Sequence, residues 1–344
     1  MILIAFGTRP EWIKIRPIVD AIHGEIPYKL LFTGQHTSLI DDSIENYQYE
    51  SMTISSDGCD NRLDSIVCSS LKNFPDGKYS AVMVQGDTTS AFAVALAAFH
   101  RRIPVIHLEA GLRTFNNKHP YPEEFNRASI TSLADIHLCP TETAERNVKN
   151  ENPNAKTYVV GNTVLDHLVG LKPSLGDFVL VTMHRRENHH NMDEWFKVIN
   201  DLAKSEKFDY DGLSFVLPIH PNPNVIQHQD LLTDVTVVPA VSHDKCIDLI
   251  NRCNFVITDS GGIQEESCFL RKKCIVCREF TERVEGLEDF AMLCKSPEDL
   301  KSLFYRIKRE KNSLIDHACP YGDGQATPKI VEILNAFFAN NTPK

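Results

Sequence analysis

Short apolar runs of β-type residues alternate with helix-length segments along the whole chain, and this alternation limits the possible folds more than any other feature. It is typical of stacked βαβ units whose strands form a parallel sheet. Residues 89–100 (TSAFAVALAAFH) are the clearest crossover helix. The pattern predicts strands at 1–6, 28–33, 81–85, 104–108, 136–139 and 157–160, and then at 178–183, 214–219, 235–238, 255–258, 274–277 and 291–294.

The two groups of expected strands indicate two domains. A chain of 344 residues suits two α/β domains of ordinary size. Residues 171–177 (LKPSLGD) contain Pro and Gly and break both periodicities, so we expect a hinge there. The predicted fold class is α/β, with two doubly wound, Rossmann-like parallel-sheet domains facing a central cleft. We place these domains at 1–170 and 178–325, and a final segment at 326–344.

Composition limits the class of protein. Hydrophobic residues make up 42% of the chain and charged residues 24%, as in an ordinary soluble enzyme. The formal net charge of −10 argues against nucleic acid as the main partner, so an anionic substrate would need a local cationic pocket. No apolar run approaches the roughly 18 residues of a membrane span. The chain starts directly with a strand-like run and shows no signal peptide, which predicts a cytoplasmic protein without a membrane partner.

The ten cysteines follow no repeating pattern. Cys274 and Cys277 form one C-x-x-C, but Ile275 and Val276 between them continue a strand core pattern. A zinc site would need a second pair at ligand spacing, and the sequence offers none. We therefore expect reduced, structural cysteines and no metal.

The segment 258–266 (TDSGGIQEE) has the form of an anion site. It follows a buried strand and opens a helix, so its turn presents free backbone N–H groups and the positive end of a helix dipole. Many α/β turns contain two glycines and bind nothing. The interpretation of this segment as an anion site is supported by further polar clusters at strand ends, where parallel sheets bind their ligands.

Three carboxylates are candidates for acid and base work. Asp87 and Glu109 end neighbouring expected strands, and Glu123 lies in a Pro-rich loop beyond them. Carboxylates that converge from different environments can divide the roles of acid and base. Asp87 could instead cap the helix that begins near Thr88, and Glu123 could cap its own helix. Glu109 has no comparable structural role, since Ala-Gly follows it.

Basic residues at other strand ends suit an anion. Arg9 lies beside a helix start in Gly-Thr-Arg-Pro and suits a diphosphate or a carboxylate, although it could also be a solvated surface residue. His184 and His220 end two neighbouring expected strands of the second domain. They could ligate a metal, but no third ligand stands at useful spacing. Phosphate contact and general acid work fit these two histidines better.

Together these motifs resemble the bacterial and archaeal UDP-N-acetylglucosamine 2-epimerases of the non-hydrolysing type. The matching pieces run in order over almost the whole chain: GTRPEWIK (7–14), TGQH (33–36), GDTTS (86–90), EAGLRT (109–114), PEEFNR (122–127), PTET (140–143), GNTVLD (161–166), HRREN (184–188), HPNPN (220–224), DSGGIQEE (259–266), TERVE (281–285) and PYGDGQA (320–326).

The resemblance implies a glycosyltransferase-B-like fold whose last helix, at 326–344, crosses back to the first domain, and a homodimer. It implies conversion of UDP-GlcNAc into UDP-ManNAc, without metal or nicotinamide cofactor, for cell-surface polysaccharide precursors. The implied route is anti elimination of UDP to 2-acetamidoglucal, followed by re-addition.

The same resemblance implies residue roles. The catalytic residues would be Asp87, Glu109, Glu123 and His184. The groups that bind UDP and the sugar would be Arg9, Lys14, Arg127, Arg185, His220, Ser260, Gly261, Gly262, Glu266 and Arg283. Glu266 would hold the ribose hydroxyls, while His184, Arg9 and the helix start at Ser260 would neutralise the departing UDP.

The chain departs from the family at 35–39 and around Asp60, positions that resemble a second, regulatory UDP-GlcNAc site. Gln35, His220 and Arg185 are what remains of it. Phe280 and Val284 also differ, at the sugar or uracil end of the pocket. The alternatives are a hydrolysing epimerase that releases ManNAc and UDP, and an epimerase for another UDP-2-acetamido sugar. In other classes, a UDP-sugar glycosyltransferase and a nucleotide-sugar sensor fit the same fold.

Overall fold

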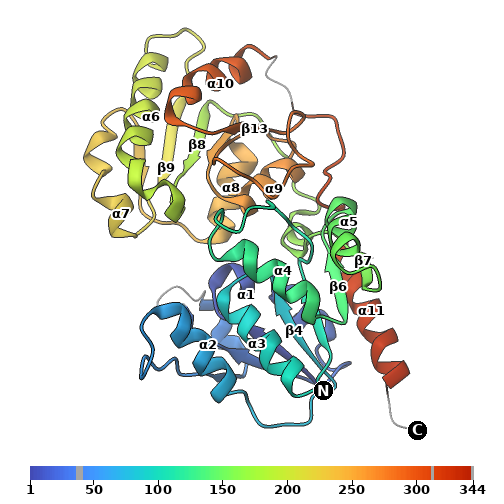
Figure 1. Cartoon of the computed structure of the whole chain (residues 1–344). Helices are drawn as coiled ribbons and strands as arrows, with labels where there is room; N and C mark the ends of the chain where they lie inside the picture. The colour runs from blue at the N-terminus through green and yellow to red at the C-terminus, as the bar shows by residue number, and fades with distance from the viewer. Residues whose placement is uncertain (36–41, 311–313, 342–344) are drawn as a thin grey trace. The chain divides into compact units, whose positions relative to one another are not determined.

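The chain folds into two structural units, each built on one parallel sheet (Figure 1). The computed structural model describes residues 1–35, 42–310 and 314–341. Unit 1 comprises Met1–His167 together with Gly322–Lys344, and unit 2 comprises Leu168–Tyr321. The predicted pair of doubly wound α/β domains is thereby confirmed.

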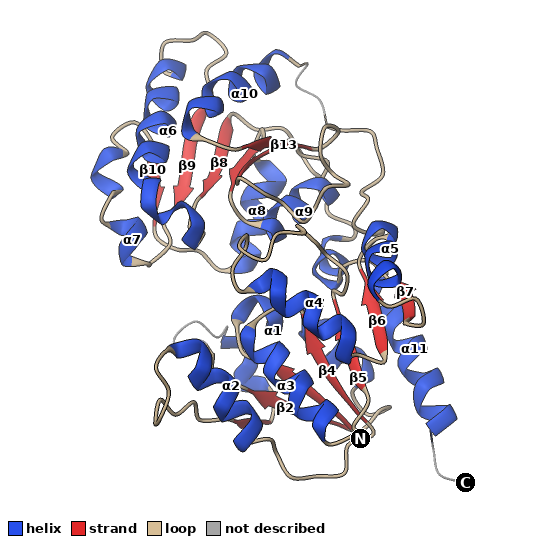
Figure 2. Cartoon of the chain, viewed as in Figure 1, coloured by secondary structure: helices blue, strands red, loops and turns tan. Residues whose placement is uncertain are grey.

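The sheet of unit 1 has the strand order β3-β2-β1-β4-β5-β6-β7. Strands are drawn in red and helices in blue in Figure 2. All five residues of β1 are buried, because helices cover both faces of a parallel sheet. Alternate residues of β1 enter two different cores: Ile4 packs with Trp12 of α1, while Leu3 packs with Val94 of α3. The strands are β1 (Ile2–Phe6), β2 (Tyr28–Phe32), β3 (Tyr49–Ser51), β4 (Ala81–Gln85), β5 (Val105–Leu108), β6 (Ile136–Cys139) and β7 (Lys156–Val159).

The helices of unit 1 connect these strands, except for the C-terminal helix α11. Their bounds are α1 (Arg9–Ile22), α2 (Arg62–Lys72), α3 (Thr89–His100), α4 (Glu123–Leu133), α5 (Glu142–Glu151) and α11 (Ala326–Asn341), with 3-10 turns η1 (Asp42–Asn46) and η2 (Thr163–Leu168). The C-terminal helix α11 packs on α1. Its first turn is held by Asp166, which accepts from the backbone N–H groups of Ala326 at 3.0 Å and Thr327 at 2.6 Å.

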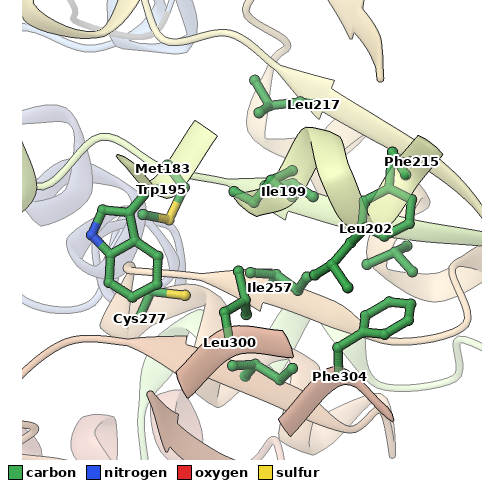
Figure 3. Close-up of a cluster of buried hydrophobic side chains, with 14 of the residues drawn as sticks. Met183, Trp195, Ile199, Leu202, Phe215, Leu217, Ile257, Cys277, Leu300 and Phe304 are labelled. Atoms are coloured by element: carbon green, nitrogen blue, oxygen red, sulfur yellow. The ribbon is translucent and has the colours of Figure 1, made fainter. Parts of the chain in front are cut away.

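The sheet of unit 2 has the strand order β10-β9-β8-β11-β12-β13. Its main core, shown in Figure 3, forms where Trp195 and Ile199 of α6 and Phe304 of α10 meet Phe215 and Ile257 of the sheet. The strands are β8 (Phe178–Thr182), β9 (Ser214–Pro218), β10 (Thr236–Val238), β11 (Val256–Thr258), β12 (Cys274–Cys277) and β13 (Ala291–Cys294). The helices are α6 (Met192–Glu206), α7 (Pro223–Ile226), α8 (His243–Arg252), α9 (Gly261–Phe269) and α10 (Pro297–Arg309), with 3-10 turns η3 (Arg186–Asn191) and η4 (Gln229–Leu231).

Every strand expected from the sequence forms, within a residue or two of its predicted ends. The edge strand β3 was not predicted, because its three residues are polar or exposed and carry no apolar run. Cys274 and Cys277 are buried in β12 as free thiols, which confirms that their C-x-x-C spacing belongs to a strand.

The predicted hinge segment, 171–177, is attached to unit 2. The N–H of Ser174 donates to Asn251 O at 3.0 Å, and Asn254 Nδ2 donates to Gly176 O at 3.0 Å. Lys272, whose side chain is completely buried, donates from Nζ to the carbonyls of Ser174 and Cys253. The structural division lies just before this segment, between His167 and Leu168. A hinge role for 171–177 stays a prediction, as does the central cleft.

Candidate functional site

In unit 1 the polar clusters gather at the carboxyl ends of three neighbouring strands. Strands β1, β4 and β5 lie side by side, and the turns after them carry Gly7–Arg9, Gly86–Asp87 and Glu109. The first turn must be tight: a Cβ atom on Gly7 would lie 2.2 Å from Thr33 Oγ1 and 2.5 Å from Ser90 Oγ. Glycine is therefore required where β1 passes its neighbours.

Glu109 is held by donors from three parts of unit 1. Lys14 Nζ of α1 lies 2.6 Å from both carboxylate oxygens, Asn162 Nδ2 donates at 3.2 Å, and Gln85 at the end of β4 also donates to the carboxylate. Glu109 is 8% exposed and has a φ of 63°, a conformation that costs energy for a residue with a side chain. Its carboxylate is therefore fixed in both position and direction.

Asp87 is paired with Arg127 of α4. Arg127 Nε and an Nη nitrogen both lie 2.6 Å from Asp87 Oδ2, and Asn126 Nδ2 donates to the Asp87 carbonyl at 2.8 Å. Asp87 does not cap α3: the cap is Thr88, whose hydroxyl accepts from Ala91 N at 3.0 Å. The alternative of a capping role for Asp87 is therefore wrong.

Glu123 is the first residue of α4 and is half-buried. It does not cap the helix either, because Pro122 occupies the N-cap. Its neighbour Glu124 bonds Arg127 at 2.9 Å and accepts the backbone N–H groups of Thr114 and Phe115. The Asp87–Arg127 pair is thus joined through Glu124 to the loop that precedes Glu123.

Four residues of this site escaped prediction from the sequence: Glu11, Gln85, Glu124 and Asn162. Three of them fall inside motifs that were recognised, and Gln85 ends a predicted strand. Each of them also bonds a residue ten or more positions away in sequence, which only the fold brings near. Arg9, which was predicted, is half-buried at the first position of α1.

Gln35, in the turn after β2, lies beside the start of α3, where its Oε1 accepts from Ser90 N at 3.0 Å. Arg62 of α2 donates to the carbonyls of Gly34 at 3.3 Å and Gln35 at 3.1 Å, so an arginine does reach this turn two residues beyond Asp60. His36 and residues 37–39, which were compared with the regulatory site, lie outside the described residues.

In unit 2, Asp259 organises the turn after β8. It is fully buried and accepts from the backbone N–H groups of His184 and Arg185 and from Asn188 Nδ2, at 2.8–3.1 Å. The ring of His184 stacks on that of His220, with centroids 5.2 Å apart. Burial lowers the pKa of His184 to about 4 against the opposing charge of Asp259, so its imidazole is neutral at pH 7.

The start of α9 keeps its donors available. Ser260 is the N-cap but makes no side-chain cap hydrogen bond. The chain must be glycine at the next position, since a Cβ on Gly261 would lie 2.4 Å from Arg283 Nη1. A Cβ on Gly262 would have only Ser260 Oγ near it, at 4.0 Å, so the space over Gly262 is open. An anion placed there would meet the amide groups of the first turn and the helix dipole.

The guanidinium of Arg283 packs against this helix start. Its guanidinium contacts the carboxylates of Glu265 and Glu282, and its side chain is 6% exposed. These two ion pairs are part of a series that connects the segment after β8 to α9. The series runs in the order Glu187–Arg278–Glu282–Arg283–Glu265. The predicted contact of Arg283 with substrate stays a prediction.

Two further predicted residues have clear surroundings. Glu266 of α9 is buried, and His243 Nε2 donates to its Oε1 at 2.6 Å. Arg185 is half-buried, and its Nε is buried without a hydrogen-bond partner. A guanidinium N–H in that state suits an incoming anion, because burial without a partner is costly.

The described residues show no metal site and no membrane span. Within 1–35, 42–310 and 314–341, no group of three or more His, Cys, Asp or Glu side chains could hold a metal ion. No helix in that part of the chain is long and apolar enough to cross a bilayer. The chemistry that the side chains themselves support is proton transfer by carboxylates in unit 1 and anion binding in unit 2.

Two buried histidines beneath the carboxylates predict acid sensitivity. His107 Nε2 donates to Gly86 O at 2.7 Å, and burial lowers the pKa of His107 to about 3 and that of His137 to about 4. The unfolded chain takes up these protons near pH 6.5, so stability should fall as the pH drops below that value, by about 2–3 kcal/mol for His107 at pH 4.5.

Denaturant unfolding at pH 7 and pH 4.5 measures this effect. His107→Gln keeps a donor for Gly86 but does not titrate, so the stability difference between wild type and variant should shrink by that amount in acid. The exposed His100→Gln is the control. A difference that is equal at both pH values would contradict the prediction.

Comparison with known proteins places the chain in a family. A family model described as UDP-N-acetylglucosamine 2-epimerase matches residues 21–335. The UDP-N-acetylglucosamine 2-epimerase of Campylobacter jejuni is 36% identical, and the match covers 97% of each chain. The crystal structure of the Neisseria meningitidis UDP-GlcNAc 2-epimerase bound to UDP-GlcNAc has a TM-score of 0.86 and 32% identity, covering 97% of this chain and 99% of that one.

A Methanocaldococcus jannaschii UDP-GlcNAc 2-epimerase in complex with UDP-GlcNAc and UDP is also similar, with a TM-score of 0.82, 30% identity and coverage of 97% of this chain and 99% of that one. The matches cover nearly the whole chain and so extend over both units. The chain therefore belongs to the UDP-N-acetylglucosamine 2-epimerase family, a family of isomerases, as its motifs predicted.

Proposed function

We propose that the protein interconverts UDP-GlcNAc and UDP-ManNAc by eliminating UDP and adding it back, and that it supplies precursors for cell-surface polysaccharide as a cytoplasmic homodimer. The observation that carries this proposal is the Glu109 carboxylate held by Lys14, Gln85 and Asn162. Such fixed geometry suits proton transfer to or from carbon, which requires a group placed close to one C–H bond. The two similar epimerase structures that hold UDP-GlcNAc support the choice of substrate.

The elimination step needs two kinds of group. A base removes the proton from C2 while the C1–O bond breaks, which gives 2-acetamidoglucal and UDP. Re-addition returns a proton to the other face of C2, so a second acid is needed there. Asp87, Glu109 and Glu123 supply carboxylates in unit 1, and their partners differ: a lysine and two amides for Glu109, and Arg127 for Asp87. The carboxylates therefore stand in different environments, as a division of acid and base roles requires.

The departing UDP carries two or three negative charges. In unit 2 the open start of α9, the Ser260 hydroxyl, the buried Arg185 Nε and the neutral His184 ring are all available donors. A neutral imidazole can donate a hydrogen bond to a phosphate oxygen without prior uptake of a proton. These groups would stabilise the charge where it develops on the β-phosphate.

Proton NMR of the purified protein with UDP-GlcNAc in deuterated water tests the function. We expect UDP-ManNAc to form, with deuterium at C2 of both sugars, because the proton that returns comes from solvent. Release of UDP with free ManNAc would show the hydrolysing reaction instead. Turnover of only another UDP-2-acetamido sugar would change the substrate, and no turnover of any of them would sink the proposal in favour of a transferase or a sensor.

Glu109→Gln tests the acid/base assignment. The amide keeps the size of the side chain but cannot exchange a proton, so turnover should fall by about 10²–10⁴-fold. Affinity for UDP, measured by titration calorimetry, should change less than threefold. Glu142→Gln, an exposed glutamate in the same unit, is the matched control. Turnover near that of wild type in Glu109→Gln would remove Glu109 from the mechanism.

Ser260→Ala tests the anion site. Its hydroxyl makes no cap hydrogen bond in the protein, so its loss should leave the melting temperature nearly unchanged. A hydrogen bond to a charged phosphate is worth about 1.5 kcal/mol or more, which predicts UDP binding weakened by about tenfold. The exposed Ser302→Ala is the control. Equal UDP affinity in wild type and Ser260→Ala would refute the anion site at this helix start.

A further inference from the structure

Glu11 is a buried carboxylate to which the proposed reaction assigns no role. It is 2% exposed and lies in the first turn of α1. Its Oε2 accepts from Gly7 N at 3.0 Å and from Thr8 Oγ1 at 2.7 Å, and its Oε1 accepts from Thr88 Oγ1 at 2.8 Å. The three donors come from the turns after two different strands.

An ordinary capping box explains only part of this arrangement. In a capping box the glutamate at the third helical position returns to the N-cap of its own helix. Thr8 is that N-cap, and its hydroxyl does accept from Glu11 N, at 3.4 Å. The second oxygen of Glu11, however, reaches Thr88, which is the N-cap of α3. One carboxylate therefore joins the starts of two helices.

The Thr88 hydroxyl has three partners, one of which is Ser90 Oγ at 3.2 Å. The Thr88 hydroxyl accepts from Ala91 N at 3.0 Å and has one hydrogen, which it donates to Glu11. The direction of the Thr88 side chain is thus fixed from both sides. Asp87, the residue before it, carries the ion pair with Arg127.

Opposing effects set the pKa of Glu11. Burial raises its pKa to about 7, and the hydrogen bonds from Thr8, Thr88 and Gly7 oppose that shift, while the negative charge of Asp87 adds to it. A carboxylate accepts all three donors, whereas an amide or a protonated acid has a donor group of its own in their place. The contacts therefore depend on the chemistry of this one side chain.

We propose that Glu11 is a positioning residue: it locks the Gly7–Arg9 turn to the Asp87–Ser90 turn, and thereby holds Arg9 and the Asp87–Arg127 pair at the spacing that the chemistry requires. The inference rests on the proposed epimerisation for its catalytic part and on the three hydrogen bonds for its structural part. Glu11 itself touches no reacting atom in this scheme.

Glu11→Gln, with the exposed Glu25→Gln as matched control, tests the catalytic part. In either orientation of the glutamine amide, its NH₂ group takes the place of a Glu11 oxygen that accepts a hydrogen bond in the wild-type protein. A displacement of about 1 Å in a catalytic group costs up to about 10²-fold in rate, so we expect kcat to fall at least tenfold. UDP affinity should fall less than kcat, because the candidate anion groups of unit 2 are unchanged and only Arg9 among the predicted UDP-binding residues belongs to the displaced turn. A kcat within twofold of wild type would overturn the proposal.

Hydrogen exchange measured by mass spectrometry tests the structural part without any turnover. If Glu11 locks the two turns together, Glu11→Gln should lower the protection of peptides spanning 7–12 and 88–92 together. Loss confined to 7–12 would reduce Glu11 to a capping residue of α1 and overturn the lock. Should wild type fail to convert any UDP-sugar, the proposed function fails, while this exchange result still decides whether the lock exists.

Thr88 variants guard against a folding defect in Glu11→Gln. Thr88→Ser keeps both hydroxyl contacts and should retain kcat within threefold. Thr88→Ala removes the link to α3 but leaves Glu11 and its bonds to Gly7 and Thr8, so its kcat should fall while UDP affinity holds. Equal kcat in the two Thr88 variants would overturn the proposal.

Discussion

The parallel pairing of β1, β4 and β5 is the constraint on which the candidate site of unit 1 depends. Ile2 aligns with Ala81 and Gln85 aligns with Leu108, so the three strands end at one edge of the sheet. Lys14 and Gln85, which are 95 and 24 positions from Glu109 in sequence, thereby become its neighbours. The polar contacts are consequences of this edge, since a shift of one strand by a single residue would turn its side chains to the other face.

The sequence predicts much of this arrangement because buried parallel strands have a strong signature. The run Ile2–Phe6 is apolar throughout and Ala81–Gln85 is apolar up to its last residue, as expected for strands covered on both faces. Polar residues just after such runs fall at the edge where parallel sheets bind ligands, and this position predicts Asp87 and Glu109 as candidate site residues. The strand β3 gives no such signal, because all three of its residues are exposed.

The hydrogen-bond partners could not be predicted, for a different reason. Glu11 follows Thr8 at the spacing of a capping box, so local chemistry already accounts for it, and its link to Thr88 depends on the fold alone. Asn162 is 53 residues from Glu109 and has no pattern that points there. The N-cap of α3 could not be predicted from residue type either, because Asp and Thr both cap helices well. The backbone conformation after β4 places Thr88 at the cap.

The charged side chains are arranged differently in the two units, and this difference matches the two parts of the proposed chemistry, proton transfer and anion binding. In unit 1, Glu109 and Asp87 each face a cation at 2.6 Å, which fixes carboxylates that must act at a defined carbon. In unit 2, the carboxylates pair with Arg278 and Arg283 below α9, while the Arg185 Nε and the first turn of α9 keep donors without internal acceptors. A chain with a net charge of −10 can hold a diphosphate only through such local donors, because its overall field repels anions. The ion pairs of Arg283 serve that purpose by neutralising Glu265 and Glu282, whose negative charges would otherwise repel an anion at the proposed site.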